Sequence, residues 1–274
     1  AASDVYKRQQ EERINWIIGE TLGTFLLVFF GCGSVATAVA LNAPVGLFQV
    51  AIVWGFGLSI AIFLTGGLSG AHLNPAITIS LVVFRAFPIG KAIGYILSQL
   101  AGAFLAASMV FLVYGGAIEA FEADNAFARG EAGSEASAMI FGEFYPNPGG
   151  KALPQSDQRT ITGAQGFLSE LLGTTLLALV VFTLTDKRSN ILPAWVIPFA
   201  IGITLTVLIS LFAPVSMGGF NPARDLAPRI FSTLAGWGSI PFSVNGYGWL
   251  TVYVIAPILG AILGGLAHRL LLSR

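Results

Sequence analysis

Long stretches without a charged residue dominate the pattern of this chain. No Asp, Glu, Lys or Arg occurs between Glu20 and Arg85, or within 92–118, 189–223 and 230–268. A helix needs about 20 apolar residues to cross a hydrocarbon core of ~30 Å, and Gly, Pro and Asn divide these stretches into segments of that length. We therefore predict an all-α membrane protein with six transmembrane helices, near residues 14–39, 47–65, 92–117, 163–185, 194–213 and 249–270.

Two further apolar segments are too short to cross a membrane. Residues 74–84 and 221–234 each begin with Asn-Pro-Ala and are crowded by Gly and Pro. A helix of about eleven residues extends about 16 Å, which is half of a bilayer. Short interrupted segments at matching places in two halves of a chain indicate a transport site. We predict two re-entrant half-helices here.

The chain contains an internal repeat. Glu20-Thr-Leu-Gly-Thr24 matches Glu170-Leu-Leu-Gly-Thr174, Asn74-Pro75-Ala76 matches Asn221-Pro222-Ala223, and Gln99-Leu-Ala-Gly-Ala103 has a weaker echo in Pro257-Ile-Leu-Gly-Ala261. The first repeat is predicted at 14–117 and the second at 163–272, joined by an extended outer loop at 118–162. Each repeat holds three spans, so the second must enter from the opposite face. The two half-helices then meet near the membrane midplane.

Composition narrows the function classes. Hydrophobic residues make up 55% and charged residues 10% of the 274 residues, and the mean hydropathy is +0.78. The 14 basic and 14 acidic residues give zero net charge, which argues against a nucleic-acid binder. The single Cys32 excludes an internal disulfide and a multi-cysteine metal site. We expect no metal and no cofactor.

The positive-inside rule gives the orientation. With the N-terminus inside, nine basic residues lie on the inner face and three on the outer. The inner set is Lys7, Arg8, Arg13, Arg85, Lys91, Lys187, Arg188, Arg269 and Arg274, and the outer set is Arg129, Lys151 and Arg159. Both termini are therefore expected in the cytoplasm, with the chain in the plasma (inner) membrane. The segment 1–13 lacks an apolar signal-peptide core, and 1–9 resemble translated adapter sequence.

Each Asn-Pro-Ala is predicted to start a half-helix, because Asn caps helices and Pro suits the first helical position. Asn74 and Asn221 then place two positive helix ends at mid-membrane, which repel cations. Their amides can donate to a passing oxygen. The runs before them, 66–73 and 214–220, are expected to be non-helical and to expose carbonyl groups to a polar cavity. The pattern describes a pore for small neutral hydroxyl compounds.

Two carboxylates lie inside the spans at matching repeat positions. Glu20 and Glu170 are expected to accept hydrogen bonds from backbone amides of the re-entrant turns. His72, two residues before Asn74, is expected to pack beside its half-helix. Arg224 is charged at membrane depth, where a charge is costly unless it is used. A salt bridge with Asp225 is the alternative to a role in the pore.

The residues Ser69-Gly-Ala-His-Leu-Asn-Pro-Ala-Ile-Thr78 and Asn221-Pro-Ala-Arg-Asp225 resemble the two signature loops of the aquaporin and aquaglyceroporin (major intrinsic protein) family. The resemblance extends over about residues 14–272. It implies an aquaporin-like fold, one pore per subunit and a homotetramer in the lipid bilayer.

Within that family, four features resemble glycerol facilitators. Asp225 follows Arg224, the outer loop is long, Trp54 resembles the aromatic of the selectivity filter, and span five has no His. The resemblance implies a filter of Trp54, Ile209, Gly218 and Arg224. Ile209 and Gly218 depart from the family pattern and make the filter wider, so urea, larger polyols and metalloid acids join glycerol and water as candidate solutes. A water-selective channel is the alternative within the family.

Two other classes of membrane protein share single features of this sequence. Gly67-Leu-Ser-Gly70 matches a Gly-x-Ser-Gly nucleophile motif, but an intramembrane serine protease needs a histidine facing Ser69 from another span. A proton- or sodium-coupled transporter needs a titratable residue along its path, and Glu20 or Glu170 could serve. We favour a passive channel without catalytic residues.

Overall fold

The computed structural model describes residues 2–41, 43–148, 161–186, 188 and 191–273, and side chains from residue 14 on. The six predicted transmembrane segments are confirmed as helices long and apolar enough to cross a bilayer. These are α1 (Ala2–Val39), α2 (Leu47–Ser69), α4 (Ile89–Asp124), α7 (Gly163–Leu184), α8 (Ile197–Ser216) and the continuous segment Gly248–Leu272. In this last segment a π-helical turn connects α11 (Gly248–Leu250) to α12 (Ala256–Ala267), and a second π-helical turn follows α12. No strand occurs among the described residues.

Two short helices complete the bundle. They are α3 (Pro75–Arg85) and α9 (Pro222–Ser232). Asn74 and Asn221 are their N-caps, and each side chain accepts hydrogen bonds from backbone N–H groups of the first turn. The second short helix ends at Ser232 rather than near 234, because the backbone enters a π-helical turn, Thr233–Trp237, where Gly236 has φ 111°.

The non-helical runs are shorter than predicted. Helix α2 continues to Ser69 and α8 to Ser216, so the predicted non-helical stretches 66–73 and 214–220 are partly wrong. Helical backbone satisfies its own polar groups, which favours extending a helix as far as the chain allows inside a membrane. The irregular backbone is confined to residues 70–73 before Asn74 and 217–220 before Asn221.

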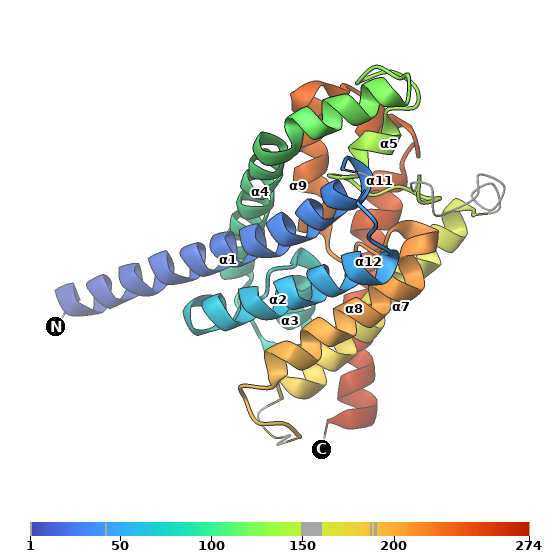
Figure 1. Ribbon diagram of the computed structural model, residues 1–274. Helices are drawn as coiled ribbons and strands as arrows, with labels where there is room; N and C mark the ends of the chain where they lie inside the picture. The colour runs from blue at the N-terminus through green and yellow to red at the C-terminus, as the bar shows by residue number, and fades with distance from the viewer. Residues whose placement is uncertain (1, 42, 149–160, 187, 189–190, 274) are drawn as a thin grey trace.

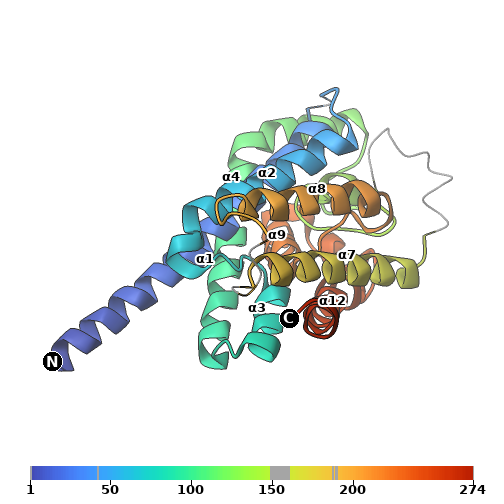
Figure 2. The ribbon, with the colours of Figure 1, turned by 90° about the horizontal axis from the view of Figure 1, so that it is seen from below.

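The two halves interlock rather than lie side by side. Helix α1 packs on α4, and α7 packs on α12, in the same manner within each half, while α2 and α8 pack on each other. Half-helix α3 packs chiefly on α12 of the second half, and α9 packs on α4 of the first. Figure 2 shows α3 beside α12 and α9 between the surrounding helices. The N-terminal part of α1 extends away from the bundle (Figure 1).

Glycines allow the helix pairs to approach closely. A Cβ on Gly102 of α4 would lie 2.2 Å from the carbonyl oxygen of Thr21, and one on Gly260 of α12 would lie 2.4 Å from that of Leu171. Thr21 and Leu171 directly follow Glu20 and Glu170, so the same contact occurs in both halves. Small residues at such crossings are typical of membrane helices, because they let the backbones meet.

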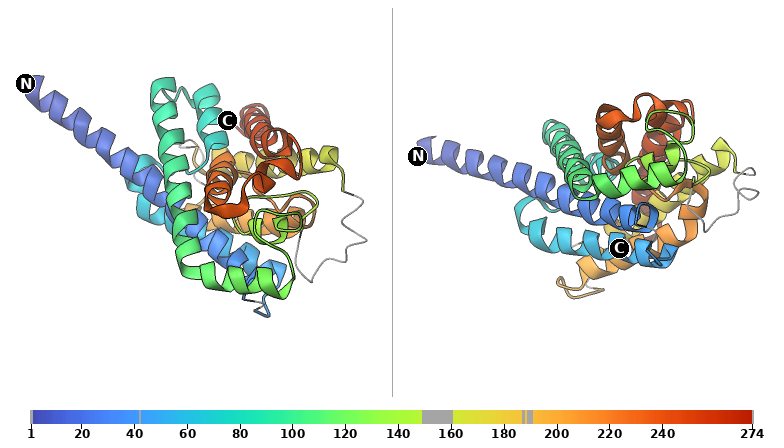
Figure 3. Two further views of the ribbon diagram at one scale, coloured as in Figure 1. Left: turned by 90° about the horizontal axis from the view of Figure 1, so that it is seen from above. Right: turned by 45° about the horizontal axis from the view of Figure 1, so that its top comes forward.

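The predicted outer loop at 118–162 is mostly ordered structure. Helix α4 continues to Asp124, α5 spans Glu135–Ala138, and the chain then turns back into the bundle, where Phe141 and Phe144 are almost fully buried. Figure 3 shows this light-green segment beside the orange-red chain that follows α9, which includes α10 (Ile240–Ser243). Residues 149–160 of the predicted loop, with Lys151 and Arg159, lie outside the described residues, as does Lys187.

Gly102→Leu should destabilise the bundle, because the new side chain would meet the backbone of Thr21. Overpacking of this kind costs about 1–3 kcal/mol or more. The thermal unfolding temperature of the protein in detergent measures the effect. Gly116→Leu, on the same helix with nothing within 4 Å of its Cβ position, is the matched control and should unfold near the wild-type temperature. Equal unfolding temperatures for the two variants would contradict the close-contact interpretation.

Candidate functional site

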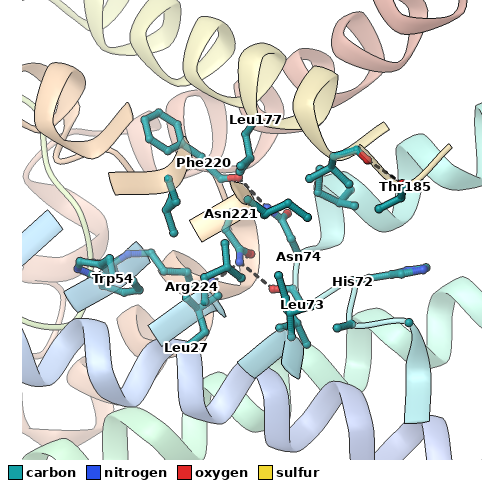
Figure 4. A pocket seen from close by; sticks show the side chains of 18 of the residues that line it. Leu27, Trp54, His72, Leu73, Asn74, Leu177, Thr185, Phe220, Asn221 and Arg224 are labelled. Carbon is teal, nitrogen blue, oxygen red and sulfur yellow. Dashed lines mark hydrogen bonds between the residues drawn. The ribbon is translucent and has the colours of Figure 1, made fainter. Parts of the chain in front are cut away.

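A cavity of about 340 Å³ runs between the helices, past the start of both half-helices. Trp54 and Arg224 line one end, Asn74 and Asn221 the middle, and Thr185 the other end (Figure 4). Its wall combines aliphatic side chains with the irregular backbone of both turns. The aliphatic lining includes Leu27, Leu58, Ile77, Leu177, Val181 and Leu205.

The two asparagines tie the turns to each other. Asn74 Nδ2 donates to the carbonyl oxygen of Phe220 at 2.8 Å, and Asn221 Nδ2 donates to that of Leu73 at 2.8 Å (Figure 4). Their Oδ1 atoms accept from backbone N–H groups of their own half-helices. Since an amide NH₂ carries two hydrogens, one hydrogen of each asparagine remains for a molecule in the cavity.

Left-handed backbone shapes both turns. Leu73 has φ 52° and Phe220 has φ 52°, directly before the two asparagines, and Ala71 and Met217 are also left-handed. Such conformations cost about 1–3 kcal/mol each for residues other than glycine, and they persist where the surroundings hold them. Residues 70–74 and 218–221 all line the cavity. Both turns therefore contribute backbone to a wall that also contains many aliphatic side chains.

Glu20 holds the first turn. Its Oε1 accepts from the Ser69 hydroxyl at 2.6 Å and from the His72 backbone N–H at 3.0 Å. Its Oε2 accepts from the Leu73 N–H at 2.8 Å and from Gln99 Nε2 at 2.7 Å. The carboxylate is fully buried and does not line the cavity. Four donors converging on one carboxylate provide the hydrogen bonds that burial requires.

Glu170 holds the second turn in the same way. It accepts from the Ser216 hydroxyl at 2.7 Å and from the N–H groups of Gly219 at 3.0 Å and Phe220 at 2.6 Å. The halves differ in one respect, because Pro257 stands where the first half has Gln99 and supplies no side-chain donor. Glu170 is fully buried and also does not line the cavity.

The four residues predicted as a filter lie together at one end of the cavity. The guanidinium carbon of Arg224 stands 4.3 Å from the ring centroid of Trp54. A Cβ on Gly218 would lie 3.4 Å from Cα of Ile209. All four line the cavity. The Phe220 ring packs on Gly173 of α7, where an added Cβ would lie 2.0 Å from it, so this aromatic supports the wall from behind.

Arg224 pairs with a residue that sequence analysis did not identify. Its Nε lies 2.8 Å from Glu143 Oε1, and its Nη1 donates to the carbonyl oxygen of Phe141 at 3.0 Å. The alternative of an Arg224–Asp225 salt bridge is wrong, because Asp225 pairs with Arg229 at 2.7 Å. Glu143 is one of seven acids in the predicted outer loop, and only its apolar neighbours in Phe141-Gly-Glu-Phe-Tyr145 set it apart.

His72 lies on the cavity wall among aromatic rings. Its ring centroid is 4.8 Å from that of Phe87 and 4.7 Å from that of Tyr95. Its Nδ1 is 3.2 Å from the hydroxyl of Thr78, on the first half-helix. The hydroxyl of Ser69 donates to Glu20 and accepts from the Ala71 N–H. Among the described hydrogen bonds, Ser69 and His72 do not form the pair that the serine-protease alternative requires.

The other end of the cavity carries a second arginine. Arg85 donates to the carbonyl oxygens of Thr185 and Phe182 and to the Thr185 hydroxyl. Just beyond lies Asp186, whose pKa is held below its usual range chiefly by hydrogen bonds from Arg188. Within the described residues, no three His, Cys, Asp or Glu side chains gather as a metal site would require.

Comparisons with known proteins agree with this geometry. The family description "Major intrinsic protein" matches residues 7–268. The chain is 39% identical to the glycerol uptake facilitator protein of Pseudomonas aeruginosa over 258 residues, which cover 94% of this chain and 88% of the relative. It is 38% identical to the Escherichia coli K12 protein of the same name, over 94% of this chain and 88% of that protein. It is 35% identical to a propanediol uptake facilitator of Citrobacter freundii, over 94% and 91% of the two chains.

A solved structure is similar in fold. The X-ray structure of the aquaglyceroporin from Plasmodium falciparum superposes with a TM-score of 0.77 at 24% sequence identity, covering 95% of this chain and 97% of the other. This similarity confirms the all-helical fold predicted from the spans and the half-helices.

Glu20→Ala should destabilise the protein and abolish a defined cavity, because four donors lose their acceptor, and two of them belong to the buried residues Leu73 and Gln99. Each buried donor left unpaired costs about 1–3 kcal/mol. The unfolding temperature in detergent and the yield of monodisperse protein measure the loss. Glu119→Ala, an exposed acid on α4, is the matched control. Wild-type stability of the Glu20 variant would show that the turn does not depend on this carboxylate.

Proposed function

This chain belongs to the major intrinsic protein family, and we propose that it is a passive channel for glycerol and similar small neutral solutes, including water. One observation carries the proposal. The cavity is lined by aliphatic side chains together with the backbone of the two turns, the two asparagines and Arg224. Such a wall matches a solute that has hydroxyl groups on one edge and carbon on the other.

Conduction then requires no chemical step. A solute enters between Trp54 and Arg224, and its hydroxyls exchange water for donors and acceptors already fixed in place. Asn74 and Asn221 are held by their reciprocal hydrogen bonds, so they offer a donor without reorganising. The carbon edge slides along the aliphatic side chains, which bind it weakly enough to release it. The proposal includes no catalytic residue, metal or cofactor.

Ions meet electrostatic barriers. Both half-helices begin at the cavity, and each N-terminus carries roughly half a positive elementary charge. Arg224 adds a full charge at the filter. A coupled transporter needs a titratable group in its path, whereas Glu20 and Glu170 bind the turns from behind and do not line the cavity. A passive channel is therefore favoured over a coupled transporter.

The filter favours a solute range broader than water alone. Ile209 and Gly218 line the filter end of the cavity, and neither has an aromatic side chain. The relatives named for glycerol and propanediol uptake support polyols as the main solutes. Urea and metalloid acids are second candidates, because Ile209 and Gly218 are smaller than an aromatic residue would be. A water-selective channel is not favoured.

We also propose an orientation in the membrane and an oligomeric state for this chain. Nine basic residues against three favour both termini on the cytoplasmic side of the plasma (inner) membrane. Large apolar side chains on the outside of the spans, such as Leu64, Leu112 and Leu211, are exposed. Such side chains can contact lipid or a neighbouring subunit. We infer a homotetramer in the bilayer, with one pore in each subunit.

Stopped-flow light scattering on proteoliposomes tests the function, with water, glycerol and urea gradients run in parallel. Glycerol entry well above that of empty liposomes is the expected result, and the urea trace reports how far Gly218 widens the filter. Fast water movement with glycerol at the level of empty liposomes would make the protein a water channel instead.

Arg224→Ala should loosen selectivity, because it removes the filter's charge and leaves Glu143 without its partner. We expect larger polyols to enter faster and cations to leak, measured by solute ranking and by the decay of an ion gradient in the same liposomes. Arg269→Ala, exposed at the end of the last span, is the control. Unchanged solute ranking and ion exclusion in the Arg224 variant would remove this arginine from the filter.

A further inference from the structure

The indole ring of Trp54 lies directly against the backbone of α1. A Cβ built on Gly31 would stand 2.2 Å from each of three successive atoms of the six-membered part of the ring, Cε2, Cδ2 and Cε3. A point equally far from three neighbouring corners of a hexagon lies on the axis through its centre, so this Cβ would enter the face of the ring. The Trp54 side chain therefore fills the space that any other residue in place of Gly31 would need for its own side chain.

Close contacts hold α2, the helix that carries this indole, on two sides. Phe30 of α1 packs on Gly57, where an added Cβ would lie 3.0 Å from the Phe30 Cβ. Helix α2 also packs on α8, where a Cβ on Gly55 would lie 2.4 Å from the carbonyl oxygen of Gly202. The backbone of α2 is therefore fixed between two helices, because close-packed interiors leave little room for a shift. A larger group beneath the indole would have to displace the ring rather than the helix.

A displaced ring would narrow the filter end of the cavity. Trp54 and Arg224 both line this end, and the guanidinium carbon is 4.3 Å from the ring centroid (Figure 4). The indole is the aromatic side chain among the four filter residues, since Ile209 and Gly218 have none. With α1 and α2 on the sides away from the cavity, the ring can move only toward the path of the solute.

We propose that Gly31 is a positioning residue of the filter, which sets the width of the filter through Trp54. The absent side chain lets the indole lie back against α1, and the filter then admits a solute as wide as a polyol. Water, which is smaller, would still pass a narrower filter. This assignment rests on the channel function proposed above and adds a residue of α1 that does not itself line the cavity.

The solute selectivity of Gly31→Ala tests the assignment. Water and glycerol permeabilities are measured on the same proteoliposomes, after subtraction of the rates of empty liposomes, so that their ratio does not depend on the amount of folded protein. The ratio of glycerol to water permeability should fall about tenfold, the effect that one methylene has on discrimination by a close-fitting pocket. A merely structural role for Gly31 would lower both permeabilities together and leave their ratio unchanged.

Gly33→Ala is the matched control on the same helix. A Cβ on Gly33 would have its nearest neighbour, Cε2 of Tyr114, at 3.9 Å, which is an ordinary van der Waals contact. This variant should keep the wild-type ratio of glycerol to water permeability.

A second background shows whether the methyl group acts through the indole. In Trp54→Phe the phenyl ring extends less far than the six-membered part of the indole, which leaves room for a Cβ on residue 31. Adding Gly31→Ala to Trp54→Phe should then change the permeability ratio by less than about twofold, because the two substitutions act on one contact. If Gly31→Ala alone yields no folded protein, the double variant should fold.

Three results would overturn the assignment. They are a wild-type permeability ratio in folded Gly31→Ala, an equal fall of the ratio in the Trp54→Phe background, and no folding of either Gly31→Ala or the double variant. Wild-type protein that passes glycerol no faster than empty liposomes would instead contradict the channel function itself. Wild-type transport with an unchanged ratio in Gly31→Ala would contradict only the role of Gly31.

Discussion

The hydrogen bonds between two buried carboxylates and two irregular turns make non-helical backbone possible in the middle of the membrane. A bilayer core offers no water to satisfy exposed N–H and C=O groups, so non-helical backbone at that depth must find partners inside the protein. Glu20 and Glu170 accept from the N–H groups of the turns, and the carbonyl groups of Leu73 and Phe220 accept from the two asparagines. The polar file of the pore therefore depends on side chains that never meet the solute.

The two halves achieve the same result with different supporting residues. In both, a serine at the end of the preceding helix donates to the carboxylate, and a tyrosine from the third span donates to that serine's carbonyl oxygen, Tyr95 to Ser69 and Tyr253 to Ser216. The first half adds Gln99, whereas the second adds the ion pair of Arg224 with Glu143 of the outer segment and the pair of Arg229 with Asp225 within α9. The buried ion pairs that support the turns therefore lie at the filter end. The two halves have similar backbones but differ in the charged side chains that hold them.

Much of this arrangement could be predicted from the sequence, because the informative signals are local or repeated. Charge-free stretches locate the spans, and the two Asn-Pro-Ala copies locate the half-helices. Glu143 could not be predicted, because its partner Arg224 lies 81 positions away and other acids of the outer segment resemble it. The sequence places the ends of α2 and α8 too early, because glycine and proline suggest breaks at positions where the membrane environment favours continued helix.

The reciprocal hydrogen bonds of Asn74 and Asn221 make each half of the chain depend on the other for a complete turn. Each asparagine completes the turn of the opposite half, through Phe220 in one case and Leu73 in the other. A nascent first half can insert its three spans but has no acceptor for Asn74 until the second half arrives. Because each turn is completed by a side chain of the other half, the paired turns at the centre of the cavity require both halves of the chain.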